Sequence, residues 1–449
     1  MNPLETYLTE LREIHDSGAA TKETSGYPAL AKLLDTVGHS LKPKVRCLIQ
    51  LKNSGVVDSD REALTRRMES YFDPGVSHEK MRRIAPGVME DTARFKANLV
   101  RDELLQRGFL KKNIVRYCYR PFDVRWLYWE PQTKLLDEKR MEYFLQVFPG
   151  NVWLSAGQRN RKEDFYQPQF TTVLADHHIV ESNVGMFPLW LKPDPDPSSL
   201  FDRDTRDHPK LNLTDAAKEY LASPRLAHKP EDLFYHILAV LHAPLYRAEN
   251  AGALRQNWPR VPLPREGLST SAELGRQVAS LLDTENPVLN VTAGKVRPKL
   301  RTIAVPSTTL TPGEFDFRVA AGWGHAGQGG VTMPGKGTML TRAYRPEEQP
   351  ETAHSELLGK STHDIYLNDT AYWRNVPEKV WDFTIGGYQV MKKWLSYREH
   401  DLLGRPLTPD EAREVTHMAR RLAALLLLSP ALDANYAAAK ASATSLPQL

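Results

Sequence analysis

The stretch that decides the fold is residues 116–128, which read Arg-Tyr-Cys-Tyr-Arg-Pro-Phe-Asp-Val-Arg-Trp-Leu-Tyr. Aromatic and β-branched residues fill both halves of this stretch, and such residues favour strands. Pro121 separates the halves, so we predict strands at 114–119 and 124–129 joined by a short turn. Because segments with helical spacing lie on both sides, the sequence predicts a mixed α/β fold of the α+β kind.

The flanking segments carry helix signals. Apolar spacing, charged faces and terminal Gly or Pro residues predict helices at 58–72, 92–107, 230–242, 271–283, 388–398 and 410–428. The last of these is expected to end before Pro430, because proline breaks the hydrogen-bond pattern of a helix. Between the fourth and fifth helices, a glycine-rich stretch has candidate strands at 301–305 and 315–320.

Changes in composition divide the chain. Residues 1–55 hold two helical patterns and a strand candidate at 45–51, which is too little for a domain, so they are an incomplete N-terminal stub. Three prolines at alternate positions within 192–199 exclude helix and central strand there. The expected parts are the stub 1–55, a helical spacer with a first β-rich part at 56–192, a second part with C-terminal helices at 193–430, and a loose tail at 431–449.

The composition is that of a folded protein. The chain has 449 residues, of which 41% are hydrophobic and 25% are charged. The longest purely apolar run, Leu422–Leu428, is far short of the roughly 20 residues of a membrane span, and no secretory leader opens the chain, so we expect a cytoplasmic protein with no membrane partner. Two cysteines, Cys47 and Cys118, cannot make a disulfide framework or a four-cysteine zinc site.

Positive charge is concentrated in two blocks. The formal net charge is only +4, but 101–162 holds 13 Lys/Arg against 7 Asp/Glu, and 291–345 holds 8 against 2. An acidic block lies between them, with 6 basic and 9 acidic residues at 194–232. This pattern suits an anionic polymer as partner. The alternative is that basic and acidic blocks pair within the protein.

Sequence motifs of common enzymes are incomplete here. Gly322–Gly327 matches a dinucleotide-binding pattern and Gly330–Lys336 nearly matches a phosphate-binding loop, but neither is followed by a helix. Gln50–Lys52 resembles part of a nuclease site without enough carboxylates to hold a metal. The chain contains no Pro-Pro pair, which a DNA amino-methyltransferase needs in the loop that holds the flipped base. We therefore expect no catalytic residues.

Metal binding is not expected either. Asp176, His177 and His178, with Glu181, are potential ligands, but adjacent histidines on a strand point to opposite faces. His236 and His242 are six residues apart and do not share a helix face. We expect these histidines to be hydrogen-bonded and structural.

Several polar segments are candidates for contact with nucleic acid. Guanidinium groups alternate with aromatic rings around Arg120 and Arg125, although both could instead pair with Asp123 and fix a corner. A cluster of side chains able to make paired hydrogen bonds to base edges comprises Gln158, Arg159, Asn160, Arg161 and Lys162. Its alternative is a solvated turn. The other candidate cations, expected to contact phosphate, are Lys299, Arg301, Lys336, Lys392 and Lys393.

Four ordered segments carry a family resemblance. They are YRPFDVRWLY at 119–128, LADHHIVESN at 174–183 with FPLWL at 187–191, FYHILAVLHAPLYR at 234–247, and VWDFTIGGYQVMKKWL at 380–395. Together they resemble the C-terminal target recognition part of type ISP restriction–modification enzymes, over about 56–430. Residues 1–55 resemble the extreme N-terminus of the same family.

The resemblance implies a sequence-specific recognition module for double-stranded DNA in a phage-defence system. Enzymes of this family join a nuclease, a translocase, an adenine methyltransferase and a target recognition domain in one chain. The helicase motifs, the S-adenosylmethionine loop and the Pro-Pro loop of the family would lie between Gly55 and Val56, where this sequence lacks them. No cofactor is therefore expected for this chain, and S-adenosylmethionine is implied for the full family enzyme.

Two alternatives remain open. The chain could be the specificity part of an adenine-N6 methyltransferase whose catalytic residues are on a separate chain that uses S-adenosylmethionine. It could also be a non-functional remnant of a larger enzyme. Co-purification with a methyltransferase chain would favour the former, and failure to fold or to bind DNA would favour the latter.

Overall fold

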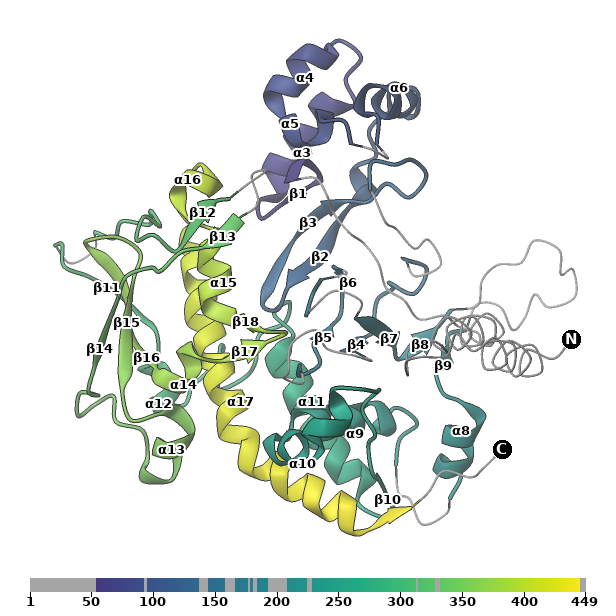
Figure 1. The fold of residues 1–449 in the computed structure, drawn as a ribbon, viewed down its shortest axis with the longest axis vertical. Helices are drawn as coiled ribbons and strands as arrows, with labels where there is room; N and C mark the ends of the chain where they lie inside the picture. Colours follow the sequence, from purple (N-terminus) through teal and green to yellow (C-terminus); the bar gives the residue numbers. More distant parts are fainter. Residues whose placement is uncertain are drawn as a thin grey trace, which may run out of the picture. The chain divides into compact units, whose positions relative to one another are not determined.

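The computed structural model describes residues 54–92, 95–136, 144–157, 166–176, 178–180, 184–192, 208–223, 228–311, 314–327 and 332–444. All of them belong to one compact unit, Cys47–Leu449 (Figure 1). The helices and the strand candidate at 45–51 that we predicted for the stub lie outside the described residues. Helices and several small sheets are both present, so the predicted mixed α/β class is confirmed.

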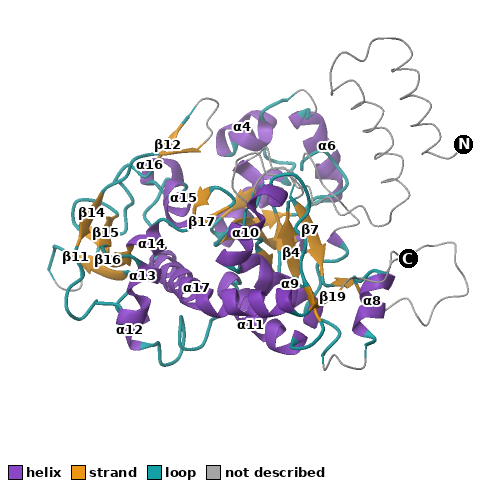
Figure 2. Ribbon diagram, turned by 60° about the horizontal axis from the view of Figure 1, so that its bottom comes forward, coloured by secondary structure: helices purple, strands orange, loops and turns teal. Residues whose placement is uncertain are grey.

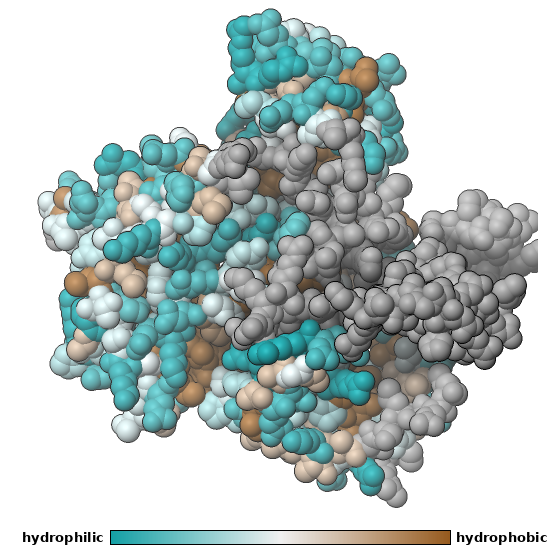
Figure 3. Space-filling model, in the orientation of Figure 1, coloured by the Kyte–Doolittle hydropathy of each residue, from teal (hydrophilic) through white to brown (hydrophobic). Residues whose placement is uncertain are grey.

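The first described elements form a small helical lobe. It contains η1 (Ser54–Val56), α3 (Arg61–Tyr71), α4 (His78–Ile84), α5 (Pro86–Met89) and α6 (Ala97–Arg107). Buried Arg101 of α6 donates hydrogen bonds to the carbonyls of Tyr71 and Val76 at 2.8 and 2.6 Å, which ties α6 to the α3–α4 turn. The helices predicted at 58–72 and 92–107 are thus present in shortened form. Hydrophilic side chains cover most of this lobe on the face in Figure 3.

The central hairpin is where the sequence placed it. Strands β2 (Ile114–Arg120) and β3 (Asp123–Tyr128) pair antiparallel, with Phe122 in the turn at φ 60°. Their sheet has the order β1-β3-β2-β6, in which β1 is Val57–Asp58 and β6 is Leu174–Ala175. Because β1 precedes α3 directly, the hairpin is joined to the helical lobe.

Two further sheets follow. Strands β5 (Phe170–Thr171), β4 (Trp153–Ala156) and β7 (Gly185–Pro188) form one, and β8 (Trp190–Leu191) pairs with β9 (Lys210–Leu211) in the other. The β8–β9 pair joins residues from both sides of the boundary that we expected at 192. The main hydrophobic core also takes residues from both sides, so the described chain is not divided there.

A helical layer packs below these sheets (Figure 2). Its helices are α8 (Asp215–Leu221), α9 (Asp232–His242), α10 (Pro244–Leu254) and α11 (Leu268–Leu282). Helices α9 and α11 lie close together because α11 carries Gly275 at their contact, where a Cβ would lie 1.8 Å from the carbonyl oxygen of Tyr235. The helices predicted at 230–242 and 271–283 are confirmed as α9 and α11. Short strand β10 (Leu263–Pro264) follows α10 and pairs with β19 (Ala443–Thr444).

A second four-stranded sheet lies on the other side of the C-terminal helix (Figure 1). Its order is β11-β16-β15-β14, with β11 Val305–Thr308, β16 Ala371–Pro377, β15 Thr362–Tyr366 and β14 Met339–Arg342. The short helix α12 (Pro298–Arg301) precedes β11.

The strands predicted at 301–305 and 315–320 are wrong. Pro298 begins α12 at a position where proline favours a helix, and β11 starts only at Val305. Residues 315–320 are not a strand because their carbonyls bind irregular partners, such as the N–H groups of His400 and Leu407.

Short elements link the second sheet to the end of the chain. They are α13 (Ser355–Leu358), α14 (Glu378–Trp381), β17 (Thr384–Ile385), β18 (Tyr388–Gln389), α15 (Val390–Ser396) and α16 (His400–Leu403). Helix α15 confirms the centre of the helix predicted at 388–398.

The C-terminal helix α17 (Pro409–Ala441) is longer than predicted and contains Pro430. The predicted end before Pro430 is wrong, and so is a loose tail beginning at 431. The cost of an internal proline is about 3 kcal/mol, and burial of Leu432 and Tyr436 offsets it. Figure 1 shows the helix bending along its length, as proline-containing helices do.

Helix α17 is long and apolar enough to cross a membrane by those two measures alone. Its contacts are instead those of a core helix. Buried Arg421 donates to the carbonyls of Ser280 and Asp283, both at 2.7 Å, and thereby caps the C-terminal end of α11. Thr416 donates to the carbonyl of Ala304 at 2.7 Å.

Candidate nucleic-acid interface

A buried ion-pair cluster fixes the turn of the β2–β3 hairpin. Asp123 is 1% exposed, and its carboxylate accepts hydrogen bonds from Arg125 at 2.6 Å and from Arg398 at 2.8 Å. Burial alone would raise the pKa of Asp123, but the two guanidinium groups outweigh it and hold the pKa well below its usual range. The turn of the hairpin is therefore held by the charged Asp123 carboxylate and two arginines, of which Arg398 is distant in the sequence.

Arg120 has a partner of its own. Its guanidinium donates to Asp176 at 2.9 Å, and Asp176 also accepts from the hydroxyl of Tyr117 at 2.5 Å and the backbone N–H of His178 at 2.6 Å. Asp176 thus accepts three hydrogen bonds from groups of the protein. Among the described residues no group of three or more His, Cys, Asp or Glu side chains is arranged to hold a metal ion.

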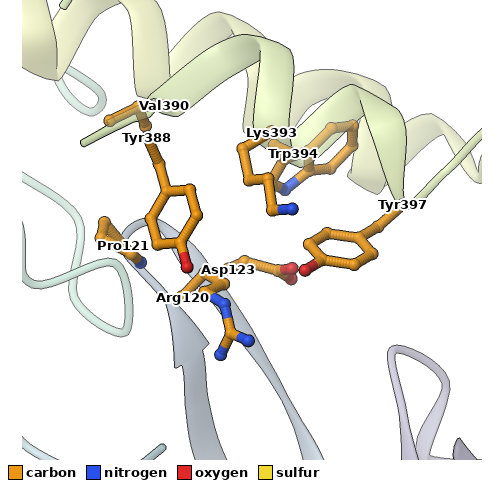
Figure 4. Close-up of a pocket in the computed structure, with 8 residues that line it drawn as sticks. All are labelled: Arg120, Pro121, Asp123, Tyr388, Val390, Lys393, Trp394 and Tyr397. Atoms are coloured by element: carbon orange, nitrogen blue, oxygen red, sulfur yellow. The ribbon is translucent and has the colours of Figure 1, made fainter. Parts of the chain in front are cut away.

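Helix α15 closes a small pocket over this corner (Figure 4). Lys393 points between the rings of Tyr388 and Tyr397, with its ammonium 5.3 and 4.7 Å from their centroids. Burial lowers the pKa of Lys393, Tyr388 opposes this shift, and the nearby Arg120 adds to it. The guanidinium of Arg125 lies 4.8 Å from the Tyr397 ring, so aromatic faces surround these cations.

The structure thus brings together three of the predicted DNA-binding residues, Arg120, Arg125 and Lys393. Arg120 and Arg125 are only 13% and 16% exposed and are engaged in ion pairs. This arrangement favours the structural alternative that the sequence left open for these two arginines. Lys392, the neighbour of Lys393, is half-buried.

The other candidate cations lie elsewhere. Lys299 and Arg301 are on α12, with Lys299 half-buried and Arg301 exposed, and Lys336 is exposed just after β13 (Thr332–Pro334). No acidic residue occurs between Glu285 and Glu314, so α12 stands within a purely basic segment. The candidates Gln158, Arg159, Asn160, Arg161 and Lys162 lie outside the described residues.

The glycine motif at 322–324 has a role that sequence reasoning missed. The carboxylate of Glu399 accepts hydrogen bonds from the backbone N–H groups of Gly322, Trp323 and Gly324 at 3.0, 2.8 and 3.3 Å. Successive N–H groups of this kind form an anion-binding concavity. The anion here is a side chain of the protein, which explains a Gly-x-Gly pattern with no following helix.

Two buried histidines, His236 and His242, are hydrogen-bonded and structural, as expected. His236 contacts the hydroxyl of Ser271 at 2.6 Å and the carbonyl of Pro262 at 2.8 Å. Burial lowers the pKa of His242 to about 4, and its ring contacts the carbonyl of Pro168 at 2.9 Å. Burial also lowers the pKa of His236, and both rings have hydrogen-bond partners within the core.

Three solved structures with a similar fold hold DNA or a DNA substrate mimic, and two of them are described as type ISP restriction–modification enzymes. A nuclease-deletion mutant of the type ISP enzyme LlaGI in complex with a DNA substrate mimic has a TM-score of 0.51 and 15% identity, over 90% of this chain and 32% of that one. The ATP-dependent type ISP enzyme LlaBIII bound to DNA has a TM-score of 0.54 and 14% identity, over 87% and 23%. The DrdV–DNA complex has a TM-score of 0.54 and 17% identity, over 87% of this chain and 35% of that one.

The chain therefore spans between about a quarter and a third of the length of these similar structures. A comparison with curated proteins found no match. One family model matches the chain, that of the type ISP C-terminal specificity domain, over residues 49–423. Because this match covers most of the sequence, the protein belongs to the family of type ISP C-terminal specificity domains.

Proposed function

We propose that this protein recognises a specific sequence of double-stranded DNA for a restriction–modification system. The observation that carries the proposal is the match to a specificity domain over residues 49–423. The similarity of its fold to three proteins solved with DNA or a DNA substrate mimic supports DNA as the partner. Recovery of a consensus sequence from a pool of random duplexes by the full chain tests it.

In this proposal, affinity and specificity come from different residues. Exposed cations such as Arg301 and Lys336 contact phosphates, which releases counterions whatever the sequence. Side chains with paired donors and acceptors, such as Gln158 and Arg159, contact base edges. The buried cluster of Asp123 holds the scaffold in place.

Adenine methylation and DNA cleavage belong to other parts of such a system. We propose that this domain directs them in the cytoplasm, through residues of a longer enzyme or of a separate catalytic chain. Co-purification of a methyltransferase with the full chain would distinguish the second arrangement.

The chain alone should transfer no methyl group to DNA, since it has no Pro-Pro loop to hold a flipped adenine. With labelled S-adenosylmethionine and DNA rich in sites, label on adenine should stay at background, while a complete adenine methyltransferase run in parallel gives stoichiometric label. S-adenosylmethionine should also leave the melting temperature unchanged, because only a ligand bound by the native state stabilises it. Stoichiometric label with the chain alone would contradict this.

Replacing Lys299 by Ala should weaken binding to cognate and random duplexes alike. One lost phosphate contact should also flatten the log–log dependence of affinity on salt by about one unit. Fluorescence anisotropy across a salt series measures both effects.

Two further variants serve as comparison. Lys218→Ala removes a cation that is paired with Asp215 at 2.7 Å in the acidic block, so the salt dependence should not change. Gln158→Ala should cost about 1–3 kcal/mol on the cognate duplex only. If Lys299→Ala changes the selected consensus and Gln158→Ala does not, the two assignments are reversed.

A further inference from the structure

The pocket between α15 and the turn of the β2–β3 hairpin contains a lysine without a counter-charge. The charged residues that line this pocket are Arg120, Asp123 and Lys393 (Figure 4). Arg120 and Asp123 already have partners of opposite charge, as described above. Within the described part of the chain, the contacts of the Lys393 ammonium are with the faces of Tyr388 and Tyr397 and not with a carboxylate. These rings attract a cation but carry no net charge, so the charge of Lys393 is not neutralised.

The surroundings of this ammonium disfavour its charged form. Burial lowers the pKa of Lys393, and repulsion by Arg120 and Arg125 lowers it further. An anion in the pocket would reverse this effect, because an opposite charge at short range favours the charged form. A half-buried cation without a partner costs stability, which indicates that its partner lies outside the chain.

Other hydrogen-bond donors of the lining residues also lack an acceptor. The Nε of Arg120 and the Nε1 of Trp394 are buried, and neither has a hydrogen-bond partner among the residues that the structure describes. Figure 4 shows that the Lys393 ammonium and the hydroxyls of Tyr388 and Tyr397 point toward the same space. A pocket with unused donors and an unpaired positive charge fits a ligand that accepts hydrogen bonds and is negatively charged.

The size of the pocket restricts which anion can bind. Its free volume is about 10 Å³, which is room for one water-sized group. One oxygen of an anion can therefore enter, while the rest of the ligand stays outside in solvent. A phosphodiester on the surface meets this condition, because its non-bridging oxygens project from the nucleic-acid backbone. A whole nucleotide or a flipped base does not fit.

We propose that this pocket binds one non-bridging phosphate oxygen of the bound DNA and that Lys393 is the cation that contacts it. The inference rests on the function proposed above. Arg120 and Arg125 keep their ion pairs and hold the hairpin turn in place, while Lys393 makes the contact. The contact reads no base, because every nucleotide carries the same phosphate. Free inorganic phosphate presents the same oxygen, so the test compares it with DNA.

The test replaces Lys393 by Gln in the full chain, which removes the charge but keeps a long polar side chain. Binding to the consensus duplex and to a random duplex should weaken by a similar factor of about tenfold, and the log–log salt dependence should flatten by about one unit. The matched control Lys218→Gln removes a charge that is already paired with Asp215 at 2.7 Å, so it should change neither quantity. Wild-type affinity of Lys393→Gln for both duplexes would overturn the inference.

The melting temperature separates this role from a structural one. Without phosphate or DNA, Lys393→Gln should melt at the wild-type temperature or above it, because an unpaired charge has been removed. A fall of several degrees would show that the ammonium serves to hold the two tyrosine rings, and would contradict the proposal.

Inorganic phosphate at constant ionic strength provides the second arm. It should raise the melting temperature of the wild type more than that of Lys393→Gln, because a ligand stabilises only the native state that binds it. An equal response of the two proteins would show that the pocket does not take phosphate. Loss of the phosphate effect in Lys393→Gln with wild-type affinity for DNA would assign the pocket to free phosphate and overturn DNA as its source.

Acetylation of the wild type gives a measurement that needs no variant. A saturating random duplex should protect Lys393 from acetic anhydride, as measured by mass spectrometry, while Lys218 is acetylated equally with and without DNA. Equal acetylation of Lys393 in both conditions would count against the proposal. A wild type that selects no consensus but shows this protection would overturn the proposed function and leave the phosphate site standing.

Discussion

Replacing Asp123 by Ala should lower the free energy of unfolding by about 3–5 kcal/mol, because removal of one member of a buried ion pair leaves the remaining charge uncompensated. Asp123 lies between Arg125 and Arg398, and both guanidinium groups would lose their carboxylate partner. Arg398 is only 3% exposed, so water cannot replace that partner without movement of the chain. Urea denaturation followed by tryptophan fluorescence measures the loss.

An exposed ion pair provides the control. Asp410 pairs with Arg413 at 2.6 Å, with side chains 82% and 61% exposed. Asp410→Ala should change stability by no more than about 1 kcal/mol, because exposed pairs are screened by solvent. Equal effects of Asp410→Ala and Asp123→Ala would show that burial does not set the energy of the hairpin corner.

The same cluster gives a pH dependence with a definite sign. The folded pKa of Asp123 lies below that of an unfolded aspartate, about 3.9. The stability that this carboxylate contributes is therefore fully present above pH 4 and is lost as the pH falls through the lower, folded pKa. Acid titration should show a weaker pH dependence below pH 4 for Asp123→Asn than for the wild type.

Replacing Gly275 by Ala should also destabilise the protein, by about 1–3 kcal/mol or more, as overpacking does. The added methyl group would lie 1.8 Å from the carbonyl oxygen of Tyr235. Because that atom belongs to the backbone of α9, no side-chain rotation relieves the clash, and α9 and α11 must move apart. Differential scanning calorimetry would detect a lower melting temperature.

Gly252 in α10 is the matched control. It is also inside a helix, but a Cβ there would meet nothing within 4 Å. Gly252→Ala should therefore stabilise the protein by about 0.5–1 kcal/mol through helix propensity alone. If Gly275→Ala were stabilising to the same extent, the close approach of α9 and α11 would not be needed for their packing.

Local sequence signals predicted the elements that they specify directly. The aromatic and β-branched halves around Pro121 gave β2 and β3, and Gly108 marked the end of α6. These signals depend only on residues close together in the sequence, so they can be recognised without knowledge of the tertiary structure. The same holds for the option that Asp123 pairs with Arg125, its neighbour but one.

Long-range contacts decided the features that were missed. Arg398 reaches Asp123 across 275 positions, and no local pattern announces such a partner. Pro430 normally ends a helix, but burial of Tyr436 in the core carries α17 past it. Glu399 binds N–H groups more than 70 residues away in the sequence. Without knowledge of this contact, the glycine motif could be interpreted only as an incomplete dinucleotide-binding pattern.

Strands β12 (Gly324–Ala326) and β13 (Thr332–Pro334) form a two-stranded ribbon, and Glu399 anchors the start of β12 through backbone N–H groups. This anchoring has a consequence for evolution and engineering. A carboxylate that holds N–H groups is indifferent to the side chains that follow, so mutation at the exposed positions His325, Ala326 and Met333 is decoupled from folding. A library randomised at these three codons should consist largely of folded proteins. Such a scaffold can acquire new binding preferences through point substitutions at these positions, because each substitution leaves the stability of the fold nearly unchanged.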